Sequence, residues 1–405
     1  MKKFNKFLSV AVASAMVMAM AGCGNTDNGS AATGTNAATE SAAADNGAAS
    51  GSVFKIGGIG PTTGGAAVYG LAVQHGAEIA VEEINAAGGI NGYQVEFKFQ
   101  DDEADAEKSV NAYNALKDWG AQVLDGSTTS GACIAVTDKT KEDNMFQITP
   151  SGSAVECVQY DNNFRVCFSN PNQGLASAQY IGENGLAEKI AVIYDSSDVY
   201  SSGIYEKFVK EAENQPFEVV AAEAFTADNK TDFSVQLQKA KDAGADMVFL
   251  PIYYQESALI LTQAAAMGYA PKWFSCDGMD GILGGVDNFD VSLTEGVMLL
   301  TPFAADATDD LTQSFVTKYK EKYGETPNQF AADSYDAIYV IKAAIEKSGV
   351  TPDMSVSDIC DGMKAAMTEI TVDGLTGNGM TWTADGEANK APKAVVIENG
   401  AYKAM

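Results

Sequence analysis

The sequence predicts an α/β fold of two Rossmann-like lobes with parallel central sheets. From Val53 onward, short runs rich in β-branched and aromatic residues alternate with stretches that have helical spacing. Such alternation indicates a parallel sheet covered by helices on both faces, because parallel strands need crossover helices. A second run of the same kind follows the segment Asn170-Pro171-Asn172, where we expect a break between the lobes.

The first run of elements is read from its apolar pattern and its stop signals. VFKIGGIG is a buried strand, the amphipathic stretch after it ends at a Gly-Gly pair, and YQVEFKFQDD alternates as a strand. The expected strands are 53–60, 93–102, 121–126 and 146–149, and the expected helices are 70–89, 105–119 and 131–144.

The second run repeats this order from the strand KIAVIYD onward. The expected strands are 189–195, 217–225, 245–251, 272–276 and 296–302, and the expected helices are 201–214, 231–243 and 256–268. Beyond Pro302 we expect two helices, at 311–323 and 329–347, and two short strands, at 379–383 and 394–398.

Composition limits the class of protein. The chain has 405 residues, of which 46% are hydrophobic and 20% charged, so it can bury a large core and is neither disordered nor collagen-like. Lys and Arg total 26 against 54 Asp and Glu, which gives a net charge of −28. The only arginine is Arg165, so the clustered cations that bind phosphate are missing and we expect no nucleic-acid partner.

The N-terminus is read as an export signal. Three lysines within the first six residues precede the apolar run 7–21, so residues 1–22 are predicted to be a signal peptide. Met20-Ala21-Gly22-Cys23 resembles the bacterial lipobox, which implies that Cys23 carries a lipid; the alternative is an ordinary leader with an incidental cysteine. The region 23–52 is then the lipidated cysteine and a disordered tether, because it has no large apolar side chain. No later segment is apolar enough to span a bilayer, so the lipid is expected to be the only membrane anchor.

Five further cysteines remain, and the sequence has a single histidine. Without a C-x-x-C pair we expect no zinc site and no metal. Cys157 and Cys167 are close enough in sequence to form a disulfide across a short loop, whereas Cys276 and Cys360 are read as buried, small apolar residues.

Several segments resemble the substrate-binding proteins of ABC importers, in the branched-chain amino-acid-binding group of type I periplasmic binding proteins. The markers, in order, are IGGIGPTTGGAAVYG, GAEIAVEEINAAGGINGYQVEFKFQDDEAD, VLDGSTTSGACIAV, ITPSGSAVE and DFSVQLQKAKDAGADMVFLPIYYQE. The resemblance implies two lobes joined by a three-crossover hinge, with the ligand held between them. It places lobe 1 at 53–171 plus 301–378 and lobe 2 at 172–300 plus 379–405.

Two loops after expected strands are candidate binding sites on physical grounds alone. The segment 127–131 opens a helix with hydroxyl side chains, and 150–153 follows the next strand. Hydroxyls and free helix N-terminal amides together form a carboxylate receptor, and such loops lie at the carboxyl edge of a sheet, where ligands bind. Simple helix capping is the alternative reading of both loops.

The resemblance assigns residues to this site. Ser130 and Ser153 match positions that bind the ligand's α-carboxylate, with Ser151 and Gly152 beside them in the second loop and Ser151 supplying backbone contacts. Asp277 matches the acidic position that pairs with the ammonium, where the family more often has a Glu. The remaining matches are aromatic positions that line the cleft, namely Tyr69, Tyr200 and Tyr253.

No catalytic site is expected, and the chain is predicted not to be an enzyme. The glycines of GGIGPTTGG miss the dinucleotide spacing and Pro61 occupies the turn, so we expect no cofactor. An exported hydrolase is disfavoured because no base stands beside a plausible nucleophile.

The expected function is that of a monomeric, lipid-anchored, extracytoplasmic receptor. It would capture an aliphatic amino acid by hinge closure and deliver it to an ABC permease with its ATPase subunits. The alternative is the same fold binding another solute, such as an amide, a urea-like compound or a sugar, or acting as a sensor.

Overall fold

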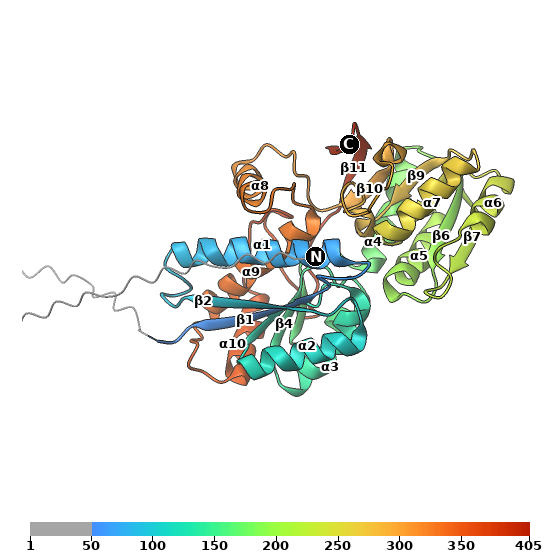
Figure 1. The fold of residues 1–405 in the computed structure, drawn as a ribbon. Coiled ribbons are helices and arrows are strands. Elements are labelled where there is room, and N and C mark those ends of the chain that lie inside the picture. Colours follow the sequence, from blue (N-terminus) through green and yellow to red (C-terminus); the bar gives the residue numbers. More distant parts are fainter. Residues whose placement is uncertain (1–50) are drawn as a thin grey trace, which may run out of the picture. The chain divides into compact units, whose positions relative to one another are not determined.

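Two separate sheets organise the chain in the computed structural model, which describes residues 51–405 (Figure 1). The expected signal peptide, Cys23 and nearly all of the tether lie outside these residues. The first sheet is wholly parallel, with the order β2-β1-β3-β4-β5. Its strands are β1 (Phe54–Gly60), β2 (Val95–Asp101), β3 (Val123–Asp125), β4 (Phe146–Thr149) and β5 (Asn163–Arg165).

The second sheet is mixed, with the order β12-β11-β10-β9-β8-β6-β7. Its five earlier strands run parallel, and the last two add an antiparallel edge. The strands are β6 (Lys189–Asp195), β7 (Glu218–Phe225), β8 (Met247–Leu250), β9 (Lys272–Ser275), β10 (Met298–Thr301), β11 (Lys393–Glu398) and β12 (Ala401–Ala404). The predicted class, an α/β fold of two lobes, is therefore confirmed, with an antiparallel edge that the sequence reading did not contain.

Helices cover both faces of each sheet (Figure 1). In the first lobe α1, α9 and α10 pack on one face and α2 and α3 on the other; in the second, α4 and α5 oppose α6 and α7. The helices are α1 (Ala67–Ala86), α2 (Ala106–Trp119), α3 (Ser130–Glu142), α4 (Asn170–Glu183), α5 (Val199–Ala212), α6 (Ser234–Asp242), α7 (Tyr254–Ala266), α8 (Asp310–Tyr323), α9 (Gln329–Ser348) and α10 (Val356–Met367). Short 3₁₀ segments are η1 (Val155–Val158), η2 (Asp277–Met279) and η3 (Val291–Thr294). No helix among residues 51–405 combines the length and the apolar character that crossing a membrane requires.

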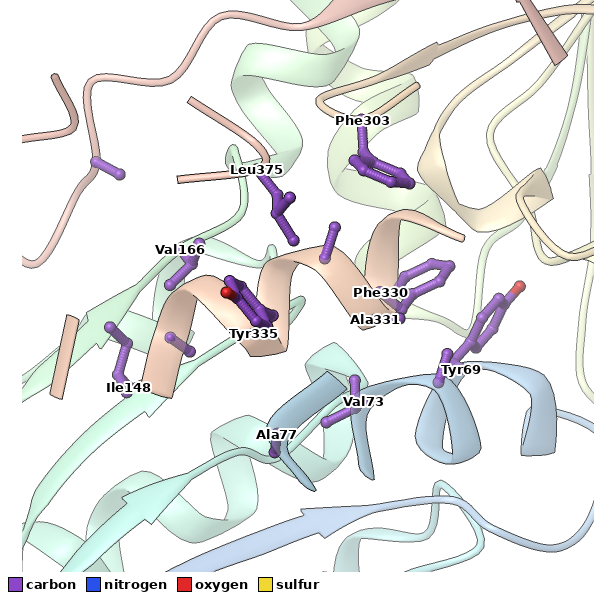
Figure 2. Packing of buried hydrophobic residues seen from close by; sticks show 14 of the residues in the cluster. Tyr69, Val73, Ala77, Ile148, Val166, Phe303, Phe330, Ala331, Tyr335 and Leu375 are labelled. Carbon is purple, nitrogen blue, oxygen red and sulfur yellow. The ribbon is translucent and has the colours of Figure 1, made fainter. Parts of the chain in front are cut away.

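Helix α9 is the central element of the first lobe. The side chain of Asn328 caps its N-terminus by accepting a hydrogen bond from the Ala331 amide, and Gly349 ends it in the left-handed conformation. The helix packs along α1 and, as Figure 2 shows, sets Phe330 beside Tyr69. This packing fixes the position of Tyr69 at the start of α1.

Two local predictions were wrong. Residues 170–172 are the start of α4 and not a break, because proline is favoured in the first turn of a helix, where its missing N–H has no partner. Residues 379–383 form only isolated bridges, Val372 with Met380 and Trp382 with Ala388, so no continuous strand is present there.

The segment 379–390 lies against the first lobe, whereas the sequence reading had assigned it to the second. The indole N–H of Trp382 donates to the Arg165 carbonyl (2.8 Å), and Nζ of Lys390 donates to Oδ1 of Asp333 (2.7 Å). Three residues after Lys390 the chain enters β11 of the second sheet. The third crossover between the sheets therefore lies at about residue 391.

The expected disulfide is a further correction. Cys157 and Cys167 are free thiols, as are the other three cysteines within the described range, and all five are buried. Cys157 packs instead against Cys133 and Ala154, so it behaves as a small apolar residue behind the loop 150–154.

Candidate functional site

The strand order creates a binding edge in each lobe. In the first sheet the chain passes from β1 to β2 on one side and to β3 on the other, and in the second from β6 to β7 and then to β8. Ligands of open parallel sheets bind beyond the carboxyl ends of the strands at such switch points. Tyr69 and Ser130 follow β1 and β3, and Tyr200 and Tyr253 follow β6 and β8.

One end of the site lies at the N-terminus of α3. Helix α3 begins at Ser130, and its first backbone hydrogen bond runs from the Cys133 amide to the Thr129 carbonyl (2.8 Å). The amides of 130–132 precede that bond, and such amides have no partner within their own helix. The macrodipole adds partial positive charge there, so this end of the helix favours a carboxylate.

The hydroxyl of Ser130 is arranged as a donor. Its Oγ accepts hydrogen bonds from the amides of Ser153 and Ala154, both at 3.1 Å. A hydroxyl has two acceptor lone pairs and one proton, so with both lone pairs occupied the proton is free to donate. Ser130 is therefore suited to donate to an anion.

The second loop, 150–153, lies directly beside Ser130 but contributes fewer side chains to the cavity than expected. Oγ of Ser151 donates to the Thr128 carbonyl (2.5 Å), and Ser151 lines the cavity. The amide of Gly152 donates to Oγ1 of Thr149 (2.8 Å). Neither Gly152 nor Ser153 is among the lining residues, and Oγ of Ser153 is buried without a hydrogen-bond partner among residues 51–405.

Asp277 faces this end from the second lobe. It follows β9, is 5% exposed, and accepts hydrogen bonds from the Tyr200 hydroxyl at Oδ1 (2.6 Å) and from Nε2 of Gln173 at Oδ2 (2.9 Å). Burial raises the pKa of Asp277 from 3.8 to about 7, although these two hydrogen bonds lower it. A cation brought next to this carboxyl would favour its ionised form.

Aromatic rings form the walls between the two ends. Tyr200 and Tyr253 stack with centroids 5.1 Å apart, and Tyr69 meets Tyr253 edge to face at 5.4 Å. Phe330 closes the other side of Tyr69, with centroids 4.5 Å apart (Figure 2). The Tyr69 and Tyr200 hydroxyls are engaged with Gly278 and Asp277, so these walls present largely apolar ring surface.

The cavity enclosed by these residues is small, at about 20 Å³, which holds about one water molecule. Six of the eight predicted ligand-binding residues line it, and Thr128, Thr129, Gly278 and Phe330 complete the lining. Larger hollows of about 450 and 510 Å³ lie beside α5 and beside α8, and neither contains a predicted site residue.

Contacts between the lobes converge on the segment that carries Asp277. The Tyr69 hydroxyl donates to the Gly278 carbonyl and accepts from the Tyr254 amide (3.2 Å). At the start of α9, Nε2 of Gln329 donates to the Asp277 carbonyl, and the Gln329 amide donates to Oδ2 of Asp280, both at 3.0 Å. First-lobe residues therefore hold η2 in place.

The architecture matches a known family over almost all of the described residues. The model of that family, described as periplasmic binding protein, matches residues 53–401. The chain belongs to the periplasmic binding protein family. Its members are solute-binding proteins, which agrees with a site built from hydroxyls, amides, aromatic rings and one carboxylate.

Relatives of this periplasmic binding protein include amino-acid-binding proteins. The Leu/Ile/Val-binding protein homolog 3 of Brucella melitensis is 31% identical over 300 residues, which covers 74% of this chain and 80% of the relative. The crystal structure of the substrate-binding protein LivJ of Streptococcus pneumoniae, in complex with isoleucine, has a TM-score of 0.78 at 28% identity, covering 87% of this chain and 98% of LivJ. A solute-binding protein of R. palustris in complex with benzoate has a TM-score of 0.76, covering 87% and 95%, but at 20% identity it shows the fold alone.

Four lining residues of this family member were missed by the sequence reading. Thr128 and Thr129 stand within the hydroxyl-rich loop already singled out, and Gly278 adjoins Asp277, so adjacency to predicted residues was a usable signal. Phe330 had no such signal, because it reaches the cavity only through the packing of α9 on α1. Within residues 51–405, no cluster of His, Cys, Asp or Glu has the makings of a metal site.

Proposed function

We propose that this periplasmic binding protein is the extracytoplasmic, lipid-anchored receptor of an ABC importer. It captures a branched-chain or other aliphatic amino acid between its lobes and delivers it to a membrane permease and the associated ATPase subunits. The receptor acts as a monomer. The observation that carries the proposal is the opposition of an anion-binding helix end at Ser130 to a buried carboxylate at Asp277, with aromatic walls between them.

These groups match the charges of a free amino acid. The carboxylate of the ligand would accept from the Ser130 hydroxyl and the first amides of α3, and its ammonium would pair with Asp277. Three or four such charge-assisted hydrogen bonds, at about 1.5 to 3 kcal/mol each, together with modest apolar burial can reach micromolar affinity of about −8 kcal/mol. The names of the relatives support the same ligand class.

Ligand entry requires the lobes to separate. A cavity of about 20 Å³ cannot admit an amino acid, so Tyr69 and Gln329 must release η2 before the ligand reaches Asp277. Closure around the ligand would restore these contacts and present a distinct surface to the permease.

A second candidate ligand is an aromatic or other carboxylate without an ammonium group. The aromatic walls favour it, and a carboxylate alone would still satisfy the α3 end of the site. Such a ligand does not need an ionised Asp277. Amides, urea-like compounds and sugars, and a sensor role for the same fold, are further alternatives.

Calorimetric titration separates these ligands. The full-length protein, unfolded to remove bound ligand and refolded, is titrated with the twenty amino acids and with benzoate, beside Ser130→Ala and Asp277→Asn. Amino-acid binding lost in both variants supports the proposal, and binding of benzoate that survives Asp277→Asn favours the second candidate. Ser257→Ala, a fully buried serine that does not line the cavity, is the matched control and is expected to bind like the unsubstituted protein.

The membrane anchor is tested separately. Cys23 lies outside the described residues, so the proposal of a lipoprotein depends on the sequence of the lipobox-like segment. Cys23→Ser is expected to release the protein from the membrane fraction of expressing cells. Continued membrane association of that variant would contradict the lipid anchor.

A further inference from the structure

Arg165 has a fully buried guanidinium group beneath the loop 150–155. It ends β5 of the first sheet and is the only arginine in the sequence. Burying a guanidinium is unfavourable unless its donors are paired. A protein with apolar residues of similar volume in place of a buried ion pair is often at least as stable. Stability alone therefore does not account for a buried arginine at this position, and its hydrogen-bond partners indicate its role.

The guanidinium donates hydrogen bonds to the backbone carbonyls of one turn. Nη1 donates to the Gly152 carbonyl (3.2 Å), and Nη2 donates to the carbonyls of Ala154 (2.8 Å) and Val155 (3.4 Å). Nε lies 3.4 Å from Oε2 of Glu387. The planar fork of an arginine suits this arrangement, which a lysine cannot reproduce because its ammonium is a point charge.

Peptide geometry transmits this contact to Ser130. The Gly152 carbonyl and the Ser153 N–H belong to one trans peptide unit, so they point in opposite directions. The carbonyl faces Arg165, and the N–H donates to Oγ of Ser130. With the Ala154 N–H donating to the same oxygen, the Ser130 proton is the group left to face a ligand.

We propose that Arg165 is a positioning residue for recognition of the ligand carboxylate. By fixing the peptide unit between Gly152 and Ser153, it orients the Ser130 hydroxyl as a donor and polarises it. Glu387 in turn forms an ion pair with Nε of Arg165. This inference rests on the proposed function, in which the carboxylate of an amino acid binds at Ser130.

The third crossover supports the backbone of Arg165 as well. The Arg165 amide donates to the Gly386 carbonyl (3.1 Å), and the Arg165 carbonyl accepts from the Trp382 indole (2.8 Å). The segment 379–390 thus clamps both the main chain and the side chain of this residue. Carboxylate recognition is thereby tied to a segment that connects the lobes.

A double-mutant cycle between Arg165 and Ser130 tests the proposal. Arg165→Lys keeps the positive charge but loses the fork, and Ser130→Ala removes the hydroxyl on which Arg165 acts. Affinity for the amino acid that binds the full-length protein most tightly is measured calorimetrically in both single variants and in the double variant. Arg165→Lys is expected to weaken binding about tenfold alone and less than about twofold in the Ser130→Ala background.

Two further variants control for damage to the fold. Lys390→Met removes the other fully buried cation of the first lobe, whose partner is Asp333 and which makes no hydrogen bond to the loop 150–155. It is expected to lower thermal stability while leaving affinity within about twofold. If Arg165→Lys does not fold, Glu387→Gln takes its place, because Glu387 is 34% exposed and its amide variant is therefore expected to fold.

The outcomes are distinguishable. For Glu387→Gln we expect affinity for the amino acid to fall about threefold. This effect is expected to disappear when Ser130 is also replaced by alanine. The positioning role alone is overturned if affinity falls equally with Ser130 present and in the Ser130→Ala background. It is also overturned if the variant of Arg165 or Glu387 that folds binds with unchanged affinity. If the unsubstituted protein binds no amino acid, the proposed function is overturned, and the positioning role with it.

Discussion

Replacing the Asp277 carboxyl by an amide is expected to stabilise the ligand-free protein at alkaline pH, although it removes the group proposed to hold the ammonium. The carboxyl is 5% exposed and receives hydrogen bonds from the uncharged groups of Tyr200 and Gln173. No Lys, Arg or His among residues 51–405 forms an ion pair with Asp277, and its hydrogen bonds offset only part of the cost of burying its charge. Asp277→Asn keeps the shape of the side chain and cannot ionise.

The magnitude follows from the raised pKa. Burial raises the pKa of Asp277 from 3.8 to about 7, so between about pH 4 and 7 the folded state keeps a proton that the unfolded chain has released. The free energy of unfolding therefore falls as the pH rises through this window. A pKa difference of about 3, at about 1.4 kcal/mol per pH unit, makes the ionised protein less stable by on the order of 4 kcal/mol.

The assay is urea unfolding of the ligand-free, full-length protein and its Asp277→Asn variant at pH 5 and pH 8. The new amide meets the donors of Tyr200 and Gln173, which lowers the stability of the variant by an amount that does not depend on pH. Other buried acids, such as Asp125 and Asp280, titrate in both proteins and cancel in the comparison. The stability of the variant relative to the unsubstituted protein is expected to rise by about 2 to 3 kcal/mol from pH 5 to pH 8.

A matched control is Asp246→Asn, which changes an exposed carboxylate of the same lobe. Its stability relative to the unsubstituted protein is expected to change much less over this range. A relative stability of Asp277→Asn that stays constant or falls between pH 5 and pH 8 would refute the reasoning, because it would show that the buried carboxyl is not destabilised by ionisation. Calorimetry on the same samples checks the accompanying loss of amino-acid binding.

Three further substitutions test single contacts. Tyr69→Phe removes the hydroxyl that donates to the Gly278 carbonyl but keeps the ring, and is expected to weaken amino-acid binding about five- to tenfold by calorimetry; unchanged affinity would show that this contact does not stabilise closure. Gln173→Met removes a hydrogen bond that lowers the pKa of Asp277, so the pH above which the amino acid binds tightly should move upward, and an unmoved midpoint between pH 6 and pH 9 would contradict this. Gly152→Ala would place a Cβ 2.7 Å from Oγ1 of Thr149 and is expected to weaken amino-acid binding at least about tenfold. The control Gly284→Ala, whose Cβ meets open space, should bind normally. Equal affinities of the two variants would show that the loop tolerates displacement.

The fold could be predicted largely from periodicity, because long buried strands and amphipathic helices carry their own pattern. The elements that were not predicted, or were predicted wrongly, are those with weak or misleading sequence signals. Strand β5 is three residues long, and Pro171 was read as an interruption although it stands in the first turn of α4. Helix α10 was not predicted, although the Ser355 side chain caps its start by accepting from the Asp358 amide.

Physical reasoning from the sequence pointed to the two loops that follow β3 and β4, which contain Ser130 and Ser151, whereas Asp277 and the three tyrosines were assigned through the family resemblance. All six of these residues line the cavity, where the topology brings the two lobes together. Phe330 and Gln329 act through the packing of α9, and Arg165 acts through carbonyls of a neighbouring turn. Such contacts depend on tertiary geometry that no local pattern encodes.

In the proposed function, ligand recognition and closure of the lobes would be coupled, because both act on η2. Asp277, the proposed partner of the ammonium, is adjacent to Gly278, whose carbonyl accepts from Tyr69. The backbone carbonyl of Asp277 accepts from Gln329. An ammonium held by Asp277 would fix the orientation of η2, and this orientation is the one that the first lobe grips. A ligand that lacked the ammonium would leave η2 less constrained, so it would close the lobes less completely. Discrimination in favour of amino acids would then arise from closure as well as from the direct contact with Asp277.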